Sequence, residues 1–374
     1  MHFRVPFLKD FEIARPQIFA GLLLLALLLT SLLSASRTSD PHGEANLLVA
    51  SLGKILWGAH SNVSNVDRIP PPPHDSILAY RVVRPLLPNT PPDLHSWRRF
   101  LFLIRAPFVI FGLWLGGALW WVTRRLYNNA GGYIALALYC SSAYIAWLSS
   151  RVNPEIMAAW GLFGIVYTSI GVAHTLYAPP RKWRPRIVLL GAAFGITAAV
   201  HLAAALVGLV LAAFFMLYLA PGRRLASLVI LAEASIIAFV ILWACYGFTS
   251  AVFATSVASL RFETVLHSLS SSAAIALSPL LVLLVISVVI FIIWPRTRYF
   301  GNWTPLLVFL VLIHLDFEGQ DSLAWTLPFA FVFVGGIFAD LLETRWRKLV
   351  AATVILAIAA QETMTLLMLF RTPH

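Results

Sequence analysis

The sequence predicts an all-α, polytopic helical membrane protein with about 11 transmembrane helices and a large first outer loop. Hydrophobic residues make up 60% of the 374 residues and charged residues only 11%, whereas soluble globular domains average about 25% charged residues. Apolar runs near the ~20 residues needed to cross a bilayer recur along most of the chain. Polar residues inside or beside these runs are therefore the candidates for a functional role.

The basic residues predict the topology of the spans. Clusters begin at Arg124, Arg181, Arg223, Arg296 and Arg345, each between two apolar runs. Excess Lys and Arg collect in the cytoplasmic loops of membrane proteins. If each apolar run is one span, all five clusters lie on the same side of the membrane, which is then the cytoplasmic side. Those runs are 18–33, 100–122, 132–148, 155–177, a pair within 187–219 that turns near position 201, 226–248, one ending at 294, 305–315, one ending before 345, and 350–370.

This topology predicts a cytoplasmic N-terminus and an outer C-terminus. The net charge of +11 then reflects cytoplasmic loops, so nucleic acid is not an expected partner. A phosphate-binding G-x-x-x-x-G-K-[ST] loop is missing from the sequence, which argues against an ATP-driven machine.

We expect a single transmembrane domain over residues 1–374. Residues 37–100 form its first outer, periplasmic loop with interfacial helices, and we expect no soluble C-terminal domain. The first apolar run could also be a signal peptide cleaved near Ser34–Ser36. An uncleaved span fits better, because the rest of the chain is equally apolar.

Candidate site residues gather on the predicted outer face. Asp40 and Glu44 directly follow the first apolar run, at a depth where water and lipid headgroups both reach. The other candidates on this face are Arg105, Arg151, Glu155, His201, Arg261 and His314. A simpler reading is that Asp40 caps an interfacial helix, with Pro41 at its first position and Glu44 in its first turn.

Several short motifs between positions 40 and 201 occur in an order typical of one enzyme family. They are Asp40–Glu44, Pro70–His74, Arg105-Ala106-Pro107, Arg125-Leu126-Tyr127, Gly131-Gly132, Arg151–Glu155, and Gly191 with Gly195 and His201. In these motifs the chain resembles the membrane-embedded GT-C glycosyltransferases. It is most similar to the dolichyl-phosphate-mannose protein mannosyltransferase group, which includes the bacterial transferases that put aminoarabinose on lipid A. The resemblance covers residues 1 to about 220 best.

The resemblance implies transfer of a sugar from a polyprenyl-phosphate donor to a lipid, glycan or protein acceptor. The transfer would invert the anomeric carbon, at the outer face of a bacterial inner membrane. Glu44 or Asp40 would be the general base. Arg105, Arg151 and Arg261 would hold phosphate oxygens. The remaining substrate-binding candidates are Glu155, His201 and His314.

One departure from the family motivates an alternative function. Gly43 stands where the family's adjacent catalytic aspartate is expected, next to Glu44. A non-catalytic GT-C-like chain could instead serve as a structural or assembly subunit, with other subunits of a membrane complex as partners. Membrane lipids are expected partners in either case.

No cofactor is required by these motifs, and no metal ligand is assigned. The acidic segment 314–321 could bind a divalent cation through carboxylate oxygens, or it could be a solvated loop.

The polar residues inside or at the ends of the apolar runs also have simpler explanations. Arg105 could extend toward the headgroups, and Arg151 could pair with Glu155 at a span end. His201 could cap a tight turn. Glu233 and Glu362 lie inside apolar runs, where acids are costly, and we expect both to make buried hydrogen bonds.

Overall fold

The computed structural model describes residues 3–4, 12–13, 15–37, 77–86, 97–246, 248, 271–314 and 322–371. Near the N-terminus, β1 (Phe3–Arg4) pairs antiparallel with β2 (Glu12–Ile13). Every other regular element in the described part is helical, as the sequence predicts. The longer helices are α1 (Arg15–Arg37), α4 (Trp97–Cys140), α6 (Pro154–Thr175), α7 (Pro180–Val200), α8 (Leu202–Leu219), α9 (Arg224–Cys245), α11 (Ser271–Ile293), α12 (Phe300–Ile313), α13 (Ser322–Leu342) and α14 (Arg347–Arg371).

Short helical segments connect or flank these elements. They are α3 (Ile77–Val83), η3 (Arg84–Leu86), α5 (Ala143–Ser149), η4 (Pro221–Arg223) and η5 (Pro295–Thr297). The α3 helix lies within the predicted first outer loop, and the Arg81 Nε donates to the Cys245 carbonyl oxygen at 2.8 Å. This bond ties α3 to the end of α9.

Helix α4 is a hairpin. Its helical geometry breaks at Tyr127 and Asn128, where Asn128 has a φ of 74°, a left-handed conformation that Asn tolerates better than most residues. The two halves then run side by side, and a hydrogen bond joins them: the Tyr139 hydroxyl donates to the Gly112 carbonyl oxygen at 2.7 Å. The first half corresponds to the predicted span 100–122, and the second half, which ends at Cys140, covers the first part of the predicted span 132–148, whose remainder forms α5.

The spans agree with the prediction in kind, while their number stays a prediction. Among the described residues, 7 helices are long and apolar enough to cross a membrane. Helices α11 and α12 contribute shorter apolar stretches, Pro279–Ile293 and Phe300–Ile313. The chain is therefore a multi-pass helical membrane protein.

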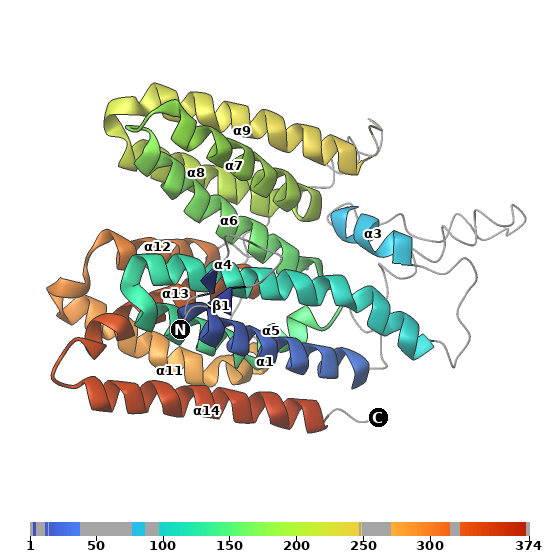
Figure 1. Ribbon diagram of the computed structural model, residues 1–374, viewed down its shortest axis with the longest axis vertical. Coiled ribbons are helices and arrows are strands. Elements are labelled where there is room, and N and C mark those ends of the chain that lie inside the picture. The colour runs from blue at the N-terminus through green and yellow to red at the C-terminus, as the bar shows by residue number, and fades with distance from the viewer. Residues whose placement is uncertain are drawn as a thin grey trace, which may run out of the picture.

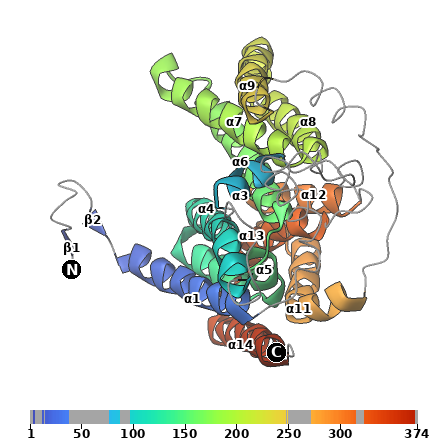
Figure 2. The ribbon, with the colours of Figure 1, turned by 90° about the vertical axis from the view of Figure 1, so that its right-hand side faces the viewer.

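Helix α13 forms the centre of the bundle, and α9 and α14 lie at opposite edges (Figure 1). In its most apolar 18-residue stretch, 83% of α13 is buried, against 33% for α9 and 22% for α14. Helix α13 packs on α4, α6 and α12, while α7 packs on α6 and α9. Figure 2 shows α7, α8 and α9 grouped away from α1 and α14.

The basic turns meet at one end of the bundle, which we call the basic end. The Arg223 guanidinium lies 5.6 Å from the centre of the Tyr177 ring, which joins the α8–α9 turn to the α6–α7 turn. The hydroxyl of Tyr127 donates to the Gly301 carbonyl oxygen and so joins the α4 turn to the start of α12. These turns lie on the left in Figure 1. Which membrane face this end meets stays a prediction.

A hydrogen-bonded group, here called the basic-end network, holds α4, α12 and α13 together at this end. The Asn302 side chain is fully buried, and its Nδ2 donates to the Thr297 carbonyl oxygen at 2.9 Å and to Asp340 Oδ2 at 3.0 Å. The Tyr299 hydroxyl donates to Asp340 Oδ1 at 3.2 Å. Tyr127, bonded to Gly301, completes the network.

The two glutamates inside apolar runs differ in burial. Glu233 is exposed on α9, and Glu362 is half-buried on α14. The expectation of a buried hydrogen-bond role is wrong for Glu233. The reason is that α9 presents a different face to the bundle, formed by Ser227, Ile230, Leu231, Ala234, Ala238 and Leu242.

Candidate functional site

Arg105 is the most unusual charged residue in the described part of the chain. It lies early in α4, its side chain is fully buried, and its guanidinium donates to the Ala35 carbonyl oxygen of α1 at 3.0 Å. The simpler reading, in which Arg105 extends toward the headgroups, is therefore wrong. A buried guanidinium is costly unless it is paired or functional.

The last turn of α1 brings Arg105 close to the segment that precedes α6. The Ser34 hydroxyl, adjacent to Ala35, is 2.9 Å from the Ser150 hydroxyl. Close packing of α4 supports this meeting, because a side chain on Gly112 would overlap Ser149. The ends of α1 and α5 and the first half of α4 thus meet around Arg105.

Glu155 begins α6 and faces the bundle interior. Asn153 caps this helix, since its Oδ1 accepts from the Glu155 N–H at 2.9 Å, and Pro154 occupies the first turn. The Glu155 carboxylate, on a side chain only 9% exposed, accepts from the Trp325 indole N–H at 2.6 Å. The positive end of the α6 dipole also favours a carboxylate at this position.

His201 caps the turn between α7 and α8, as its simpler reading predicted. Its Nδ1 accepts from the Ala204 N–H at 3.2 Å, and its ring meets the Trp325 ring edge to face at 4.5 Å. Burial lowers the pKa of His201 to about 3. The imidazole is therefore neutral at physiological pH, and because Nδ1 accepts a hydrogen bond, the proton resides on Nε2.

These residues form what we call the distal cluster, at the end of the bundle opposite the basic turns. Its members are Ser34, Arg105, Ser150, Glu155, His201 and Trp325. The segment 150–155 connects the Arg105 side of the cluster to the Trp325 side. The cluster places a buried cation and a buried carboxyl group in one layer, an arrangement suited to binding a polar group inside the membrane boundary.

The other predicted site residues lie at the edge of the cluster or outside the described residues. The guanidinium of Arg151 lies 5.1 Å from the centre of the Trp147 ring. Arg151 and Glu155 thus each contact a tryptophan, Trp147 and Trp325. The exposed His314 ends α12, with Nδ1 2.6 Å from the Leu310 carbonyl oxygen. It therefore lies on the surface and not in the distal cluster.

The predicted catalytic pair lies outside the described residues, as does Arg261. Asp40 and Glu44 directly follow α1 in the sequence, and α1 ends in the distal cluster. Among the described residues, no group of three or more His, Cys, Asp or Glu side chains could hold a metal ion. The acidic segment considered for a divalent cation continues beyond His314 into residues 315–321, which also lie outside the described part.

Sequence reasoning missed three members of the cluster. Trp325 is 1% exposed and joins Glu155 to His201, yet in the sequence it is one tryptophan near the start of a span, like several others. Ser34 and Ser150 have no motif that separates them from ordinary helix-end serines. A large polar aromatic residue predicted inside a span, where its N–H needs a partner, was the available signal.

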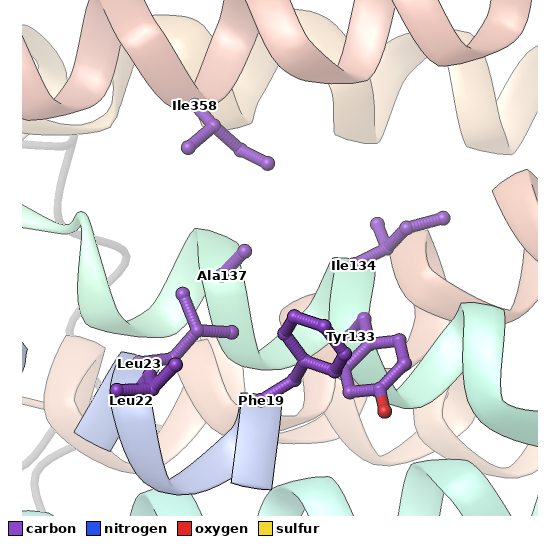
Figure 3. Close-up of a pocket in the computed structure, with 7 residues that line it drawn as sticks. All are labelled: Phe19, Leu22, Leu23, Tyr133, Ile134, Ala137 and Ile358. Carbon is purple, nitrogen blue, oxygen red and sulfur yellow. The ribbon is translucent and has the colours of Figure 1, made fainter. Parts of the chain in front are cut away.

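A hollow of about 560 Å³ lies elsewhere, between α1, α4 and α14 (Figure 3). Its lining residues are Phe19, Leu22, Leu23, Tyr133, Ile134, Ala137 and Ile358. The hydroxyl of Tyr133 donates to the Pro16 carbonyl oxygen at 3.1 Å, so the polar atom of the lining is already bonded. The hollow suits hydrocarbon and offers no catalytic group.

No family model matches this sequence, and no curated protein matches it. Solved structures do match its fold. The apo structure of ArnT from Cupriavidus metallidurans aligns with a TM-score of 0.57 and 12% sequence identity, over 91% of this chain and 61% of that chain. The chain has an ArnT-like fold. The resemblance to GT-C proteins predicted from the sequence is thus confirmed at the level of the fold.

A second ArnT structure gives the same result. ArnT from Cupriavidus metallidurans bound to undecaprenyl phosphate aligns with a TM-score of 0.59 and 13% identity, over 89% of this chain and 61% of that chain. The chain thus spans about three fifths of the length of these ArnT structures.

Proposed function

We propose that this protein transfers a sugar from a polyprenyl-phosphate donor to a lipid, glycan or protein acceptor in a bacterial inner membrane. The observation that carries the proposal is the buried Arg105, held against the last turn of α1 in an ArnT-like fold. An ArnT structure with this fold holds undecaprenyl phosphate. A buried guanidinium binds phosphate oxygens in a bidentate manner, so Arg105 suits the phosphate of such a donor.

The proposed reaction is a single displacement with inversion. The acceptor hydroxyl oxygen attacks the anomeric carbon, while the bond from that carbon to the donor phosphate oxygen breaks. The polyprenyl phosphate leaves with the electron pair, and the acceptor proton moves to the carboxylate of Glu44 or Asp40. Arg105 stabilises the charge that develops on the leaving phosphate.

The remaining members of the cluster position the sugar and the helices. Glu155 accepts from the Trp325 indole N–H at 2.6 Å, which orients its carboxylate, and a carboxylate can accept a sugar hydroxyl. The neutral His201 supports the same tryptophan ring. We place Arg151 and Arg261 as further phosphate-binding candidates, and His314 as a substrate-binding candidate at the surface. A divalent cation at segment 314–321 is an additional proposal.

The test is turnover of polyprenyl-phosphate sugars by the purified full chain in lipid vesicles. The donors differ in sugar, and product is detected by mass spectrometry. We expect one donor to be consumed by the wild type, and Glu44→Gln or Asp40→Asn to abolish transfer. Full activity in both variants would make the catalytic assignment wrong.

The alternative is a non-catalytic GT-C-like subunit of a larger membrane complex. Gly43 favours it, because the family places a catalytic aspartate beside the glutamate. If the wild type neither binds nor turns over any donor of the panel, this second function becomes the better one. Donor binding without turnover would retain Arg105 as a phosphate site and remove only the catalysis.

A further inference from the structure

The hollow between α1, α4 and α14 lies in the half of the bundle next to the basic end. Figure 3 shows Ile358 of α14 on one side of it and Phe19 of α1 on the other. Phe19 lies about 6 Å along α1 from the helix start at Arg15, and Ile358 about 17 Å along α14 from Arg347, at the ~1.5 Å rise of an α-helix. A hydrocarbon core is about 30 Å thick, so the hollow ends near the middle of the membrane.

Helix α14 is fixed to the rest of the bundle on the far side of this hollow, toward the distal end. The Thr365 hydroxyl donates to the Ser141 carbonyl oxygen at 2.7 Å. The Arg37 guanidinium donates to the Leu369 carbonyl oxygen at 3.3 Å and so joins the last turns of α1 and α14. Toward the basic end the hollow separates the same two helices. The gap is therefore part of the folded structure.

The size of the hollow excludes a second helix as its occupant. An α-helix is about 10 Å across and advances 5.4 Å per turn, so three turns need roughly 1,300 Å³. The hollow offers about 560 Å³, which lies within the ~300–1,000 Å³ of small-ligand sites. Its lining is apolar, and the Tyr133 hydroxyl already donates to the Pro16 carbonyl oxygen. A hydrocarbon chain fits this space.

Arginines from two helices lie above the hollow at the basic end. Arg347 is exposed and lies three helical turns before Ile358, a spacing that puts both residues on the same face of α14. Arg124 is half-buried on α4, and a side chain on Gly132 would overlap it. Gly132 directly precedes Tyr133, which lines the hollow. An apolar space below and positive charge above match the two parts of an acidic lipid.

We propose that the hollow binds one acyl chain of an anionic phospholipid from the leaflet at the basic end, with the lipid phosphate at Arg347 and Arg124. The apolar lining alone selects little, because lipid tails are as apolar as leucine. The arginines supply the selection, since a guanidinium holds phosphate oxygens in a bidentate manner. A headgroup without an ammonium keeps its negative charge and is attracted to basic residues next to the membrane.

The depth of the hollow separates this lipid from the donor of the proposed transfer. The donor phosphate is assigned to Arg105 in the distal cluster, at the opposite end of the bundle. None of the residues that line the hollow belongs to that cluster. The phospholipid is therefore a second lipid ligand, and its binding does not depend on whether the chain transfers sugar.

Photo-cross-linking tests where the acyl chain lies. The full chain is placed in phosphatidylcholine vesicles with a trace of phosphatidylglycerol that carries a diazirine in the middle of one acyl chain. Cross-linked peptides are then identified by mass spectrometry. We expect cross-links on the segments of α1, α4 and α14 that line the hollow. A phosphatidylcholine probe with the same diazirine should react there about tenfold less, as expected for two cations near a membrane surface.

Filling the hollow should remove these cross-links. Ala137→Phe places a ring in the space, and Ala352→Phe is the matched control because Ala352 is exposed on another face of α14. Only Ala137→Phe should lose the phosphatidylglycerol cross-links. Leu22 is 56% exposed, so Leu22→Trp obstructs the hollow from the lipid side and keeps the test valid if Ala137→Phe fails to fold.

The charge is tested separately from the space. Arg347→Gln should lower the preference for the phosphatidylglycerol probe over the phosphatidylcholine probe about fivefold, as expected for one cation. Arg224→Gln, exposed at the start of α9 on the opposite edge of the bundle, is the control and should leave the preference unchanged.

Three results would overturn the proposal. Equal cross-linking by the two probes would mean that the hollow takes any lipid tail. Cross-links that persist in Ala137→Phe and Leu22→Trp would place the acyl chain elsewhere. Displacement of the probe by polyprenyl phosphate at a lower concentration than by unlabelled phosphatidylglycerol would assign the hollow to the donor chain. Because these variants lie outside the distal cluster, a failure here leaves the proposed transfer untouched.

Discussion

The two ends of the helical bundle bury polar side chains in different ways. The basic-end network joins α4, α12 and α13 through an amide, tyrosine hydroxyls, backbone carbonyls and one carboxylate, Asp340. The distal cluster draws on α1, α4, α6, α8 and α13 and includes a fully buried guanidinium, Arg105. The first arrangement fixes how neighbouring helices pack.

The contrast separates stability from function within one bundle. Hydrogen bonds between helices in membranes contribute modestly, about 0.6 kcal/mol on average, so the basic-end network needs no functional explanation. An intramembrane Arg such as Arg105 is costly by at least about 2.5 kcal/mol on insertion scales. The buried charge distinguishes the distal end from the basic end, and it is where we propose that the donor phosphate binds.

Arg105→Lys should show the largest effect. A lysine keeps the charge but loses the planar pair of donors, so we expect transfer to fall about 100-fold, close to 2.7 kcal/mol of transition-state stabilisation. Initial rates in vesicles measure it. Arg298→Lys at the basic end is the control and should transfer at the wild-type rate. Equal transfer rates for Arg105→Lys and the wild type would mean that Arg105, like the polar residues of the basic end, serves only the packing of the helices.

The distal end should contribute a pH dependence to the stability of the protein. Because burial lowers the pKa of His201 to about 3, the unfolded chain binds a proton below about pH 6.5 that the folded chain does not. Stability therefore falls as the pH drops from about 6.5 toward 3. Between pH 6.5 and 4.5 we expect the wild type to lose about 2 kcal/mol more than His201→Asn.

His201→Asn is a suitable comparison because asparagine also caps helices. Unfolding in mixed detergent and dodecyl sulfate at each pH gives the two free energies. A wild type and variant with parallel pH profiles would show that His201 titrates normally in the folded protein.

Asp340→Ala should destabilise the basic end without slowing transfer. The buried Asn302 amide loses one of its two acceptors and Tyr299 loses its acceptor, at a cost of about 1.5 kcal/mol. The unfolding free energy should drop while the rate per folded molecule stays at the wild-type value. A slowed rate in a folded Asp340→Ala sample would couple the basic end to the reaction.

Trp325→Phe and Tyr127→Phe form the smallest and most direct comparison. Each removes one buried donor, toward Glu155 or toward the Gly301 carbonyl oxygen, and each should cost about 1 kcal/mol of stability. Only Trp325→Phe should also slow transfer, by about fivefold, because it removes the Trp325 hydrogen bond that orients the Glu155 carboxylate. Transfer rates of the two variants, normalised to the amount of folded protein, show whether only the Trp325 donor matters for the reaction. Equal slowing in both variants would mean that loss of either hydrogen bond loosens the packing of the whole bundle.

The fold was predictable because it follows from one-dimensional signals. Apolar runs and basic clusters predicted the spans and the shared basic end, and the α4 hairpin and the turn at His201 lie where the sequence predicted turns. The distal cluster was predictable only in part. Arg105, Glu155 and His201 were named, but their actual neighbours, Ala35 and Trp325, depend on which helices meet.

The orientation of each helix was the part that sequence could not supply. Glu233 was expected to be buried, since acids in apolar runs usually face the interior. Its outward position is decided by Gly191 and Gly195 on another helix, and no pattern within α9 carries that information.

The hairpin in α4 has a consequence for biogenesis. Gly132 lies so close to Arg124 that a side chain there would overlap it, and the two halves are already bonded through Tyr139 and Gly112. Only Tyr127 and Asn128 depart from helical geometry within α4. The connection between the two halves is therefore too short to form a separate hydrated loop while the second half is synthesised. We expect the two halves to leave the insertion machinery together, as one preassembled pair around which later helices are added.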